Sequence, residues 1–155
     1  MPTISLDRID REILNQLQAD GRMTNAQLAD RVNLSPSACL RRVRALEGNG
    51  VIDRYAMLVN QGAVGKPTNV FVEISLNSQS EEVLKGFEER AAQCPDILEC
   101  YLMAGDFDYL VRVAVANAED YERIHKTQLS RLPNVAHIKT SFTLRVICKK
   151  TAFEF

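Results

Sequence analysis

The sequence predicts an α+β protein with two parts. Three short helical patterns with tight connections occupy the first fifty residues. Beyond them, segments rich in β-branched and aromatic residues alternate with two more helical patterns in the order β-α-β-β-α-β. That order is typical of a ferredoxin-like domain, in which two helices cover one face of an antiparallel sheet. We therefore expect a small helical domain joined to a larger sheet domain.

The composition is that of a soluble globular protein of 155 residues, 46% hydrophobic and 25% charged. No apolar run approaches the roughly 20 residues that span a bilayer, and the N-terminus lacks the apolar core of a signal peptide. We expect a cytoplasmic protein with no membrane partner. The four cysteines form no CxxC pair, which favours small buried side chains in a reducing compartment over a zinc site or disulfide.

The first two helical patterns cover residues 6–19 and 25–32. The first ends at Asp20-Gly21, and its apolar residues recur at helical spacing. In the second, Thr24 is a good N-cap and Gln27 completes a capping box. With a third helix close behind, this is the outline of a helix-turn-helix, although an ordinary three-helix bundle shares it.

The third helical pattern, residues 35–50, is the expected DNA recognition helix. Ser35 can cap it, Pro36 suits its first position, and Gly48 or Gly50 can end it. An apolar side consists of Cys39, Leu40, Val43 and Leu46. The opposite side consists of Ser37, Ala38, Arg41 and Ala45, flanked by Arg42 and Arg44. Small residues around a central arginine let such a helix approach DNA in the major groove closely, whereas an isolated basic helix could equally be a solvated surface helix.

These positions define the candidate DNA contacts. Arg41 and Ser37 are expected near base edges. The residues expected near phosphates are Arg42, Arg44, Ser35 and Thr24. The full set is Thr24, Asn25, Ser35, Ser37, Ala38, Arg41, Arg42 and Arg44. Residues 1–60 hold eight arginines against seven acids, whereas residues 61–155 are net negative. Because any basic patch is local, tight binding to double-stranded DNA would need two or more copies of the chain.

Residues 51–59 have strand character, and residues 60–68 contain two glycines and a proline. We interpret them as a connecting strand and a linker, which gives domains at 1–53 and 69–155 with residues 54–68 between them. The stretch that begins LDRIDREILNQLQADG and continues through LSPSACLRRVRALEGNGVIDRY resembles the DNA-binding domain of the Lrp/AsnC (leucine-responsive, feast/famine) transcriptional regulators along nearly its full length. The resemblance implies a winged helix-turn-helix, a RAM/ACT-like effector domain, and a nucleoid-associated prokaryotic protein.

The second half supplies the elements of the sheet domain. The β-rich segments are residues 69–76, 97–104, 109–116 and 135–148, and the helical patterns are residues 80–93 and 118–131. In the last strand Ile138, Thr140, Phe142, Leu144 and Val146 share a face. Apolar residues on both strand faces, namely Phe71, Leu98, Leu102, Leu110 and Ala114, indicate that the helix-free face meets a second copy. The resemblance likewise implies dimers paired sheet to sheet that join into an octamer or similar ring.

The segment AGDFDYL, residues 104–110, is ordinary β-hairpin turn chemistry, but a glycine-containing turn with carboxylates also suits a zwitterion. GDFDY is similar to the GDxDY-type loop with which relatives contact an effector between dimers. The resemblance implies a free amino acid and, as first candidates for its contacts, Met103, Ala104, Gly105, Asp106, Asp108 and Tyr109. TSFTL matches the family's TSFxL segment and adds Thr140, Ser141 and Thr143.

The effector's identity stays open among leucine, other branched or aromatic amino acids, cysteine and methionine. We expect no cofactor and no enzymatic activity. The two histidines, His125 and His137, belong to no catalytic constellation, and the sequence has no nucleotide-binding fingerprint. A metal site joining both histidines to a cysteine is the weakest alternative. The main rival is an amino-acid-binding oligomeric or architectural, chromatin-like protein without specific operator recognition.

Overall fold

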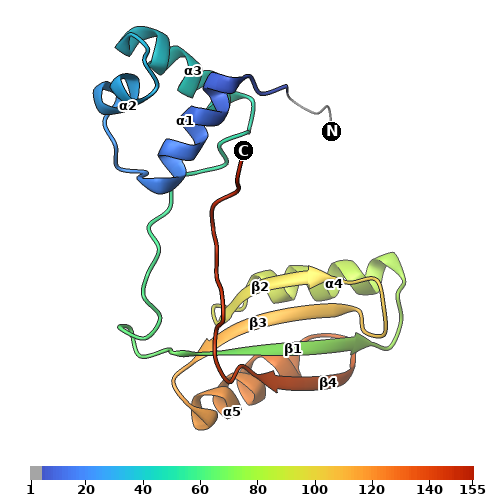
Figure 1. The fold of residues 1–155 in the computed structure, drawn as a ribbon. Helices are drawn as coiled ribbons and strands as arrows, with labels where there is room; N and C mark the ends of the chain where they lie inside the picture. The colour runs from blue at the N-terminus through green and yellow to red at the C-terminus, as the bar shows by residue number, and fades with distance from the viewer. Residues whose placement is uncertain (1–4) are drawn as a thin grey trace. The chain divides into compact units, whose positions relative to one another are not determined.

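The computed structural model describes residues 5–155, which divide into two compact units (Figure 1). The N-terminal unit contains the chain up to Leu58 together with Ile147–Phe155, and the C-terminal unit is Val59–Val146. The chain therefore passes between the units twice, once on the way out and once on the way back.

Three helices form the N-terminal unit: α1 (Arg8–Ala19), α2 (Asn25–Arg31) and α3 (Pro36–Gly48). Thr24 caps α2 in a capping box with Gln27, and Ser35 caps α3 by accepting the Ala38 amide, so both predicted caps are confirmed. Helix α1 begins two residues later than predicted because Asp7 and Asp10 form a further capping box.

The turn between α2 and α3 is tight because Asn33 adopts a left-handed conformation, with φ of 54°, which asparagine tolerates better than most residues. The helices pack around a small core made of Ile13, Leu14, Leu28, Ala29, Val32, Cys39 and Leu46. The apolar side predicted for α3 is thus buried at Cys39 and Leu46, whereas Leu40 remains 38% exposed.

The segment after α3 forms no β-ladder among the described residues. Residues 53–60 are extended but have no strand to bond, so the strand character predicted for residues 51–59 is not realised within the single chain. Tyr55 holds the segment against the helices, because its hydroxyl donates to Glu47 at 2.9 Å and its ring lies beside Gly21. Burial, and then the bond to Glu47, raises the pKa of Tyr55 to about 12.

The C-terminal unit has the predicted β-α-β-β-α-β order. Its elements are β1 (Thr68–Leu76), α4 (Glu81–Ala92), β2 (Ile97–Leu102), β3 (Tyr109–Val115), α5 (Ala118–Thr127), a short 3₁₀ turn (Leu129–Arg131) and β4 (Val135–Phe142). All pairings are antiparallel, in the order β2-β3-β1-β4. Figure 1 shows α4 and α5 on the same face of this sheet.

Side-chain alternation along the two central strands builds the main core. Val70, Val72 and Ile74 of β1, like Val111 and Val113 of β3, are fully buried beneath the helices. The intervening residues point to the helix-free face. Leu144 and Val146 were predicted to extend the alternation of β4, but this prediction is wrong: β4 ends at Phe142, and without a strand partner Leu144 is fully exposed.

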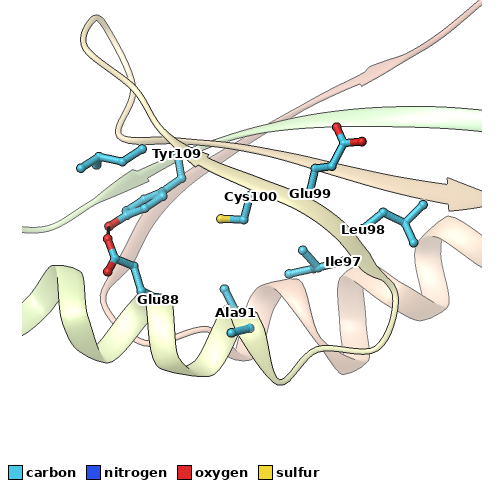
Figure 2. Close-up of a pocket in the computed structure, with 9 residues that line it drawn as sticks. Glu88, Ala91, Ile97, Leu98, Glu99, Cys100 and Tyr109 are labelled. Carbon is cyan, nitrogen blue, oxygen red and sulfur yellow. Dashed lines mark hydrogen bonds between the residues drawn. The ribbon is translucent and has the colours of Figure 1, made fainter. Parts of the chain in front are cut away.

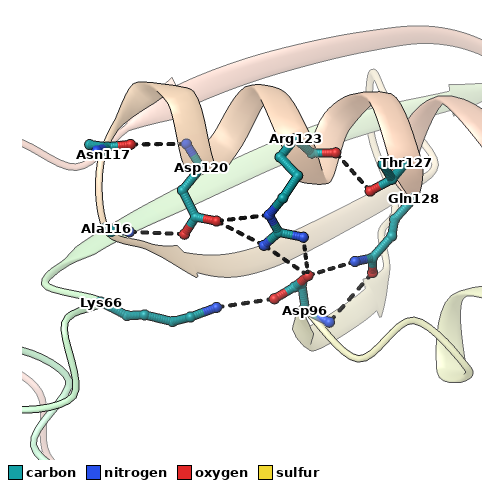
Figure 3. Close-up of polar contacts among 8 residues, drawn as sticks. All are labelled: Lys66, Asp96, Ala116, Asn117, Asp120, Arg123, Thr127 and Gln128. Atoms are coloured by element: carbon teal, nitrogen blue, oxygen red, sulfur yellow. Dashed lines mark hydrogen bonds and ion pairs between the residues drawn. The ribbon is translucent and has the colours of Figure 1, made fainter.

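A polar cluster around Asp96 ties the start of β2 to α5 and to the loop before β1 (Figure 3). The Asp96 carboxylate accepts from Lys66 at 3.1 Å, from Gln128 at 2.6 Å and from Arg123. Burial raises the pKa of Asp96, but these donors outweigh burial and leave the pKa below its usual range. The cluster therefore fixes the edge of the sheet domain.

Two further findings concern membrane-spanning helices and metal sites. No helix in residues 5–155 is long and apolar enough to cross a membrane. Over the same residues, no three His, Cys, Asp or Glu side chains gather into a group that could hold a metal ion. His125 lies in α5 against the ring of Tyr121, whereas His137 lies in β4 opposite Ser75.

Candidate DNA-binding and effector-binding sites

Helix α3, the predicted recognition helix, exposes most of the face that the sequence predicted. Ser37, Arg41 and Arg44 are exposed, and Ala38 is half-buried next to them. Within the part of the chain that the structure describes, neither Arg41 nor Arg44 is held in an ion pair. Two guanidinium groups on a helix face without bulky neighbours can reach base edges or phosphates.

Arg42 differs from these two arginines. Its guanidinium donates to Asp7 at 2.7 Å and to Asp10 at 2.8 Å, and only 30% of its side chain is exposed. The Asp10 backbone amide, and then Arg42, lower the pKa of Asp7. Arg42 therefore joins α3 to the N-terminal end of α1. To make its predicted phosphate contact, the Arg42 guanidinium would have to divide its donors between the phosphate and these two carboxylates.

The two predicted contacts at the start of α2 also have structural roles. Thr24 exchanges hydrogen bonds with Gln27 as the helix cap. Asn25 donates its side-chain amide to the Pro36 carbonyl at 2.8 Å, which holds the first turn of α2 against the first turn of α3. The helix starts that carry Thr24 and Ser35 are consequently linked.

The predicted effector loop between β2 and β3 has a rigid base and an exposed tip. The Met103 amide donates to the Asp108 carbonyl at 2.8 Å and closes the turn. Ala104, Gly105 and Asp106 are exposed at the tip, where Gly105 has a φ of 157° that other residues rarely adopt. No described ion pair engages Asp106, so its carboxylate is available for a ligand's ammonium group.

Asp108 and Tyr109 point inward from the base of the loop. Asp108 is 7% exposed, and its carboxylate oxygens accept from the Leu76 amide at 2.7 Å and from Gln79 at 2.6 Å. Tyr109 is 1% exposed, stacks on Phe87 with ring centroids 4.3 Å apart, and donates its hydroxyl to Glu88. Burial and Glu88 raise the pKa of Tyr109. Both residues therefore support the loop from below.

The three candidates near the end of β4 do not converge with this loop within one chain. Thr140 shares a hydrogen bond with the Tyr121 hydroxyl beneath α5, and Ser141 points to the opposite face, where it pairs with Phe71. Thr143 bonds to Asn69, at the end of β1 away from the loop. Because β1 lies between β3 and β4, the two sets of candidates are not on neighbouring strands within one chain.

Sequence reasoning missed a cavity of about 330 Å³ between α4 and β2, shown in Figure 2. Its lining combines apolar side chains with two carboxylates and a thiol: Glu88, Ala91, Ala92, Ile97, Leu98, Glu99, Cys100, Leu102 and Tyr109. Burial, and then Glu88, raises the pKa of Cys100 to about 11, so the thiol stays protonated at neutral pH. The only sequence signal was the apolar edge strand carrying Leu98 and Leu102.

The helix-free face of the sheet mixes apolar and paired polar side chains. Phe71 and Tyr101 are 38% and 52% exposed there. On β3, between the strands that carry Phe71 and Tyr101, Arg112 donates to Asn69 at 2.9 Å and forms an ion pair with Glu99. A face on which the charges already neutralise each other can be covered by another protein surface without burying an unpaired ion.

Comparisons with known proteins agree for both units. Residues 6–53 match the model of a winged helix-turn-helix DNA-binding domain, and residues 69–153 match the model of the Lrp/AsnC ligand-binding domain. The leucine-responsive regulatory proteins of Klebsiella pneumoniae and Escherichia coli K12 are each 44% identical over 139 residues, which is 90% of this chain and 85% of theirs.

Solved structures show the same similarity over most of the chain. An AsnC-family regulator from Agrobacterium tumefaciens superposes with a TM-score of 0.90 at 36% identity. A transcriptional regulator from Neisseria meningitidis, solved as an L-Met complex, superposes with a TM-score of 0.89 at 31% identity. Each match covers 96% of both chains. With both domain models and these relatives in agreement, this chain belongs to the Lrp/AsnC family of DNA-binding transcriptional regulators.

Proposed function

We propose that α3 recognises a specific operator, with Arg41 and Ser37 at base edges and Arg44, Ser35 and Thr24 at phosphates. The observation that carries this proposal is the exposed face of α3, on which Arg41 and Arg44 have no described ion pair to break. An arginine free of internal partners can make the bidentate contact with guanine that specifies a base pair. Asn25, Ala38 and Arg42 then position this face, and Arg42 remains a candidate phosphate contact.

The proposed assembly is a homo-oligomer. A dimer would place two copies of α3 about one DNA turn, roughly 34 Å, apart. Joining dimers into an octamer or similar ring would multiply contacts that are weak for a chain with a net charge of −1. With DNA as its partner, the regulator acts in the cytoplasm, on the nucleoid of a prokaryotic cell.

The proposed effector is a free amino acid bound between copies. The exposed tip of the loop, with Met103, Gly105 and Asp106, would meet the ammonium group and backbone of the ligand. Thr140, Ser141 or Thr143 of another copy would complete the site, because the sheet order separates the two sets within one chain. Leucine and methionine are the first ligands to test, since the curated relatives are named for leucine and the Neisseria structure is a complex with L-Met.

The first experiment is a thermal-shift screen of the purified protein against the twenty amino acids. A ligand that binds only the folded state raises the midpoint temperature of unfolding. At a ligand concentration a hundred times its dissociation constant, the gain in stability is about 2.7 kcal/mol. The matched variant is Asp106→Asn, which removes the exposed carboxylate without disturbing a described contact. We expect a shift in the wild type that is reduced in this variant; equal shifts in both would exclude Asp106 from the site.

The DNA half of the proposal has its own test. We expect Arg41→Ala to lose about 1 to 3 kcal/mol of operator affinity and to tolerate base changes under its position, as the loss of a base contact predicts. Arg44→Ala should weaken binding to all sequences and lower the salt slope by about one. Fluorescence anisotropy on operator and random DNA distinguishes the two. If the wild type binds both DNAs equally, the architectural alternative is favoured.

A further inference from the structure

The returning segment, residues 147–155, contacts helix α1 of the N-terminal unit. The side-chain amide of Gln18 forms two hydrogen bonds with the backbone of one residue, Phe153. Gln18 Nε2 donates to the Phe153 carbonyl at 3.1 Å, and Gln18 Oε1 accepts from the Phe153 amide at 2.8 Å. A primary amide thus takes the place of a neighbouring strand and satisfies both backbone groups of an extended residue.

The contact requires an amide at position 18. A carboxylate has acceptors but no donor, and an apolar side chain of the same length has neither. Phe153 is 76% exposed, and the hydrogen bonds to Gln18 use only its backbone. Gln18 itself is exposed on α1, where a solvated side chain would be free to rotate unless this contact held it.

The same end of α1 meets the outgoing segment as well. The ring of Tyr55 lies beside Gly21, three residues beyond Gln18, while its hydroxyl bonds to Glu47 of α3. Both stretches of chain that lead to the C-terminal unit therefore contact residues at the C-terminal end of α1. The other end of α1 holds α3 through the pairs of Asp7 and Asp10 with Arg42.

We propose that residues 147–155 act as a strap: an extended segment bound on α1 through Gln18, so that the DNA-binding domain carries the end of the effector domain's own chain as an intramolecular ligand. Only nine residues separate the Phe153 anchor on α1 from Thr143, which is hydrogen-bonded to Asn69. A shift at the end of β4 then reaches α1 through a short chain, and α1 is the helix that supports α3. The strap does not depend on which amino acid, if any, the effector domain binds.

Hydrogen exchange of the full chain, followed by mass spectrometry of the peptide covering residues 147–155, tests the strap. In the wild type we expect the Phe153 amide to exchange on the order of fivefold more slowly than in an unstructured peptide, the factor that one net hydrogen bond supplies. Gln18→Met should raise the rate to that of the free peptide while peptides from α2 and α3 keep their protection. Phe153→Pro removes the backbone N–H that donates to Gln18, so the amides of neighbouring residues in the segment should likewise exchange faster.

The matched control is Gln16→Met on the same helix. Gln16 bonds to Glu12 and Arg31 and has no described contact with the returning segment, so its loss should leave the segment protected. Protection lost in Gln18→Met and retained in Gln16→Met supports the strap. An unprotected segment in the wild type, or equal protection in the two variants, would overturn it.

Discussion

The recognition helix and the loop between β2 and β3 use polar side chains in opposite ways. On α3 two of the three predicted arginines, Arg41 and Arg44, are exposed and free of described ion pairs, and only Arg42 is engaged with other residues. In the loop the acidic residue at the tip, Asp106, is exposed, whereas Asp108 two positions later is buried with both carboxylate oxygens bonded.

We infer from this difference that a polar residue in a predicted functional motif can have a structural role instead of a ligand contact. A residue available for binding must keep unsatisfied donors or acceptors at the surface, whereas a residue that supports a site must have them satisfied inside the fold. By this criterion we propose Arg41 and Asp106 as binding residues, and Arg42 and Asp108 as residues that mainly support the fold around them.

The largest effect should come from Asp108→Ala. Leaving the Leu76 amide buried without its acceptor, and releasing Gln79, removes two charge-assisted hydrogen bonds, so we expect a loss of about 2 to 4 kcal/mol in the free energy of unfolding. Urea unfolding measures it. The exposed counterpart, Asp106→Asn, should change stability by less than about 0.5 kcal/mol. Equal stability of Asp108→Ala and the wild type would return Asp108 to the list of ligand contacts.

A smaller effect separates the arginines of α3. Arg42→Ala breaks the pairs with Asp7 and Asp10, which are partly exposed, so we expect a small loss in the stability of the N-terminal unit. Arg44→Ala should leave stability unchanged and act only on DNA. Thermal unfolding of both variants, beside their DNA affinities, distinguishes support from contact. A stability loss in Arg44→Ala equal to that in Arg42→Ala would remove the distinction.

Local rules were sufficient for most of the fold. The caps at Thr24 and Ser35 and the periodic spacing of the helices depend only on neighbouring residues, and the structure confirms them. Strand ends were less predictable, because a strand exists only where a partner bonds it. The alternation that continues through Leu144 therefore predicted more of β4 than forms.

The roles of the motif residues could not be predicted from spacing. Neither the pairing of Arg42 with Asp7, 35 positions earlier, nor that of Asp108 with the Leu76 amide leaves a mark in the local sequence. The cavity between α4 and β2 was missed for the same reason, since Glu88 and Cys100 meet only when the helix packs on the edge strand. The motif predicts where the site lies, and the roles that we propose within it come from the tertiary contacts.

Acid provides the finest test of the Arg42 contact. The Asp10 amide and Arg42 hold the pKa of Asp7 below its ordinary 3.8, so Asp7 binds a proton more readily in the unfolded chain than in the folded one. Its contribution to stability is therefore complete above about pH 5, starts to decline near pH 4, and disappears as pH falls through the lowered pKa.

Asp7→Asn keeps a good N-cap but removes this titration. We expect unfolding midpoints measured from pH 6 to pH 3 to fall more steeply in the wild type than in Asp7→Asn. Parallel profiles would mean that neither the Asp10 amide nor Arg42 stabilises the charged form of Asp7 in the folded chain.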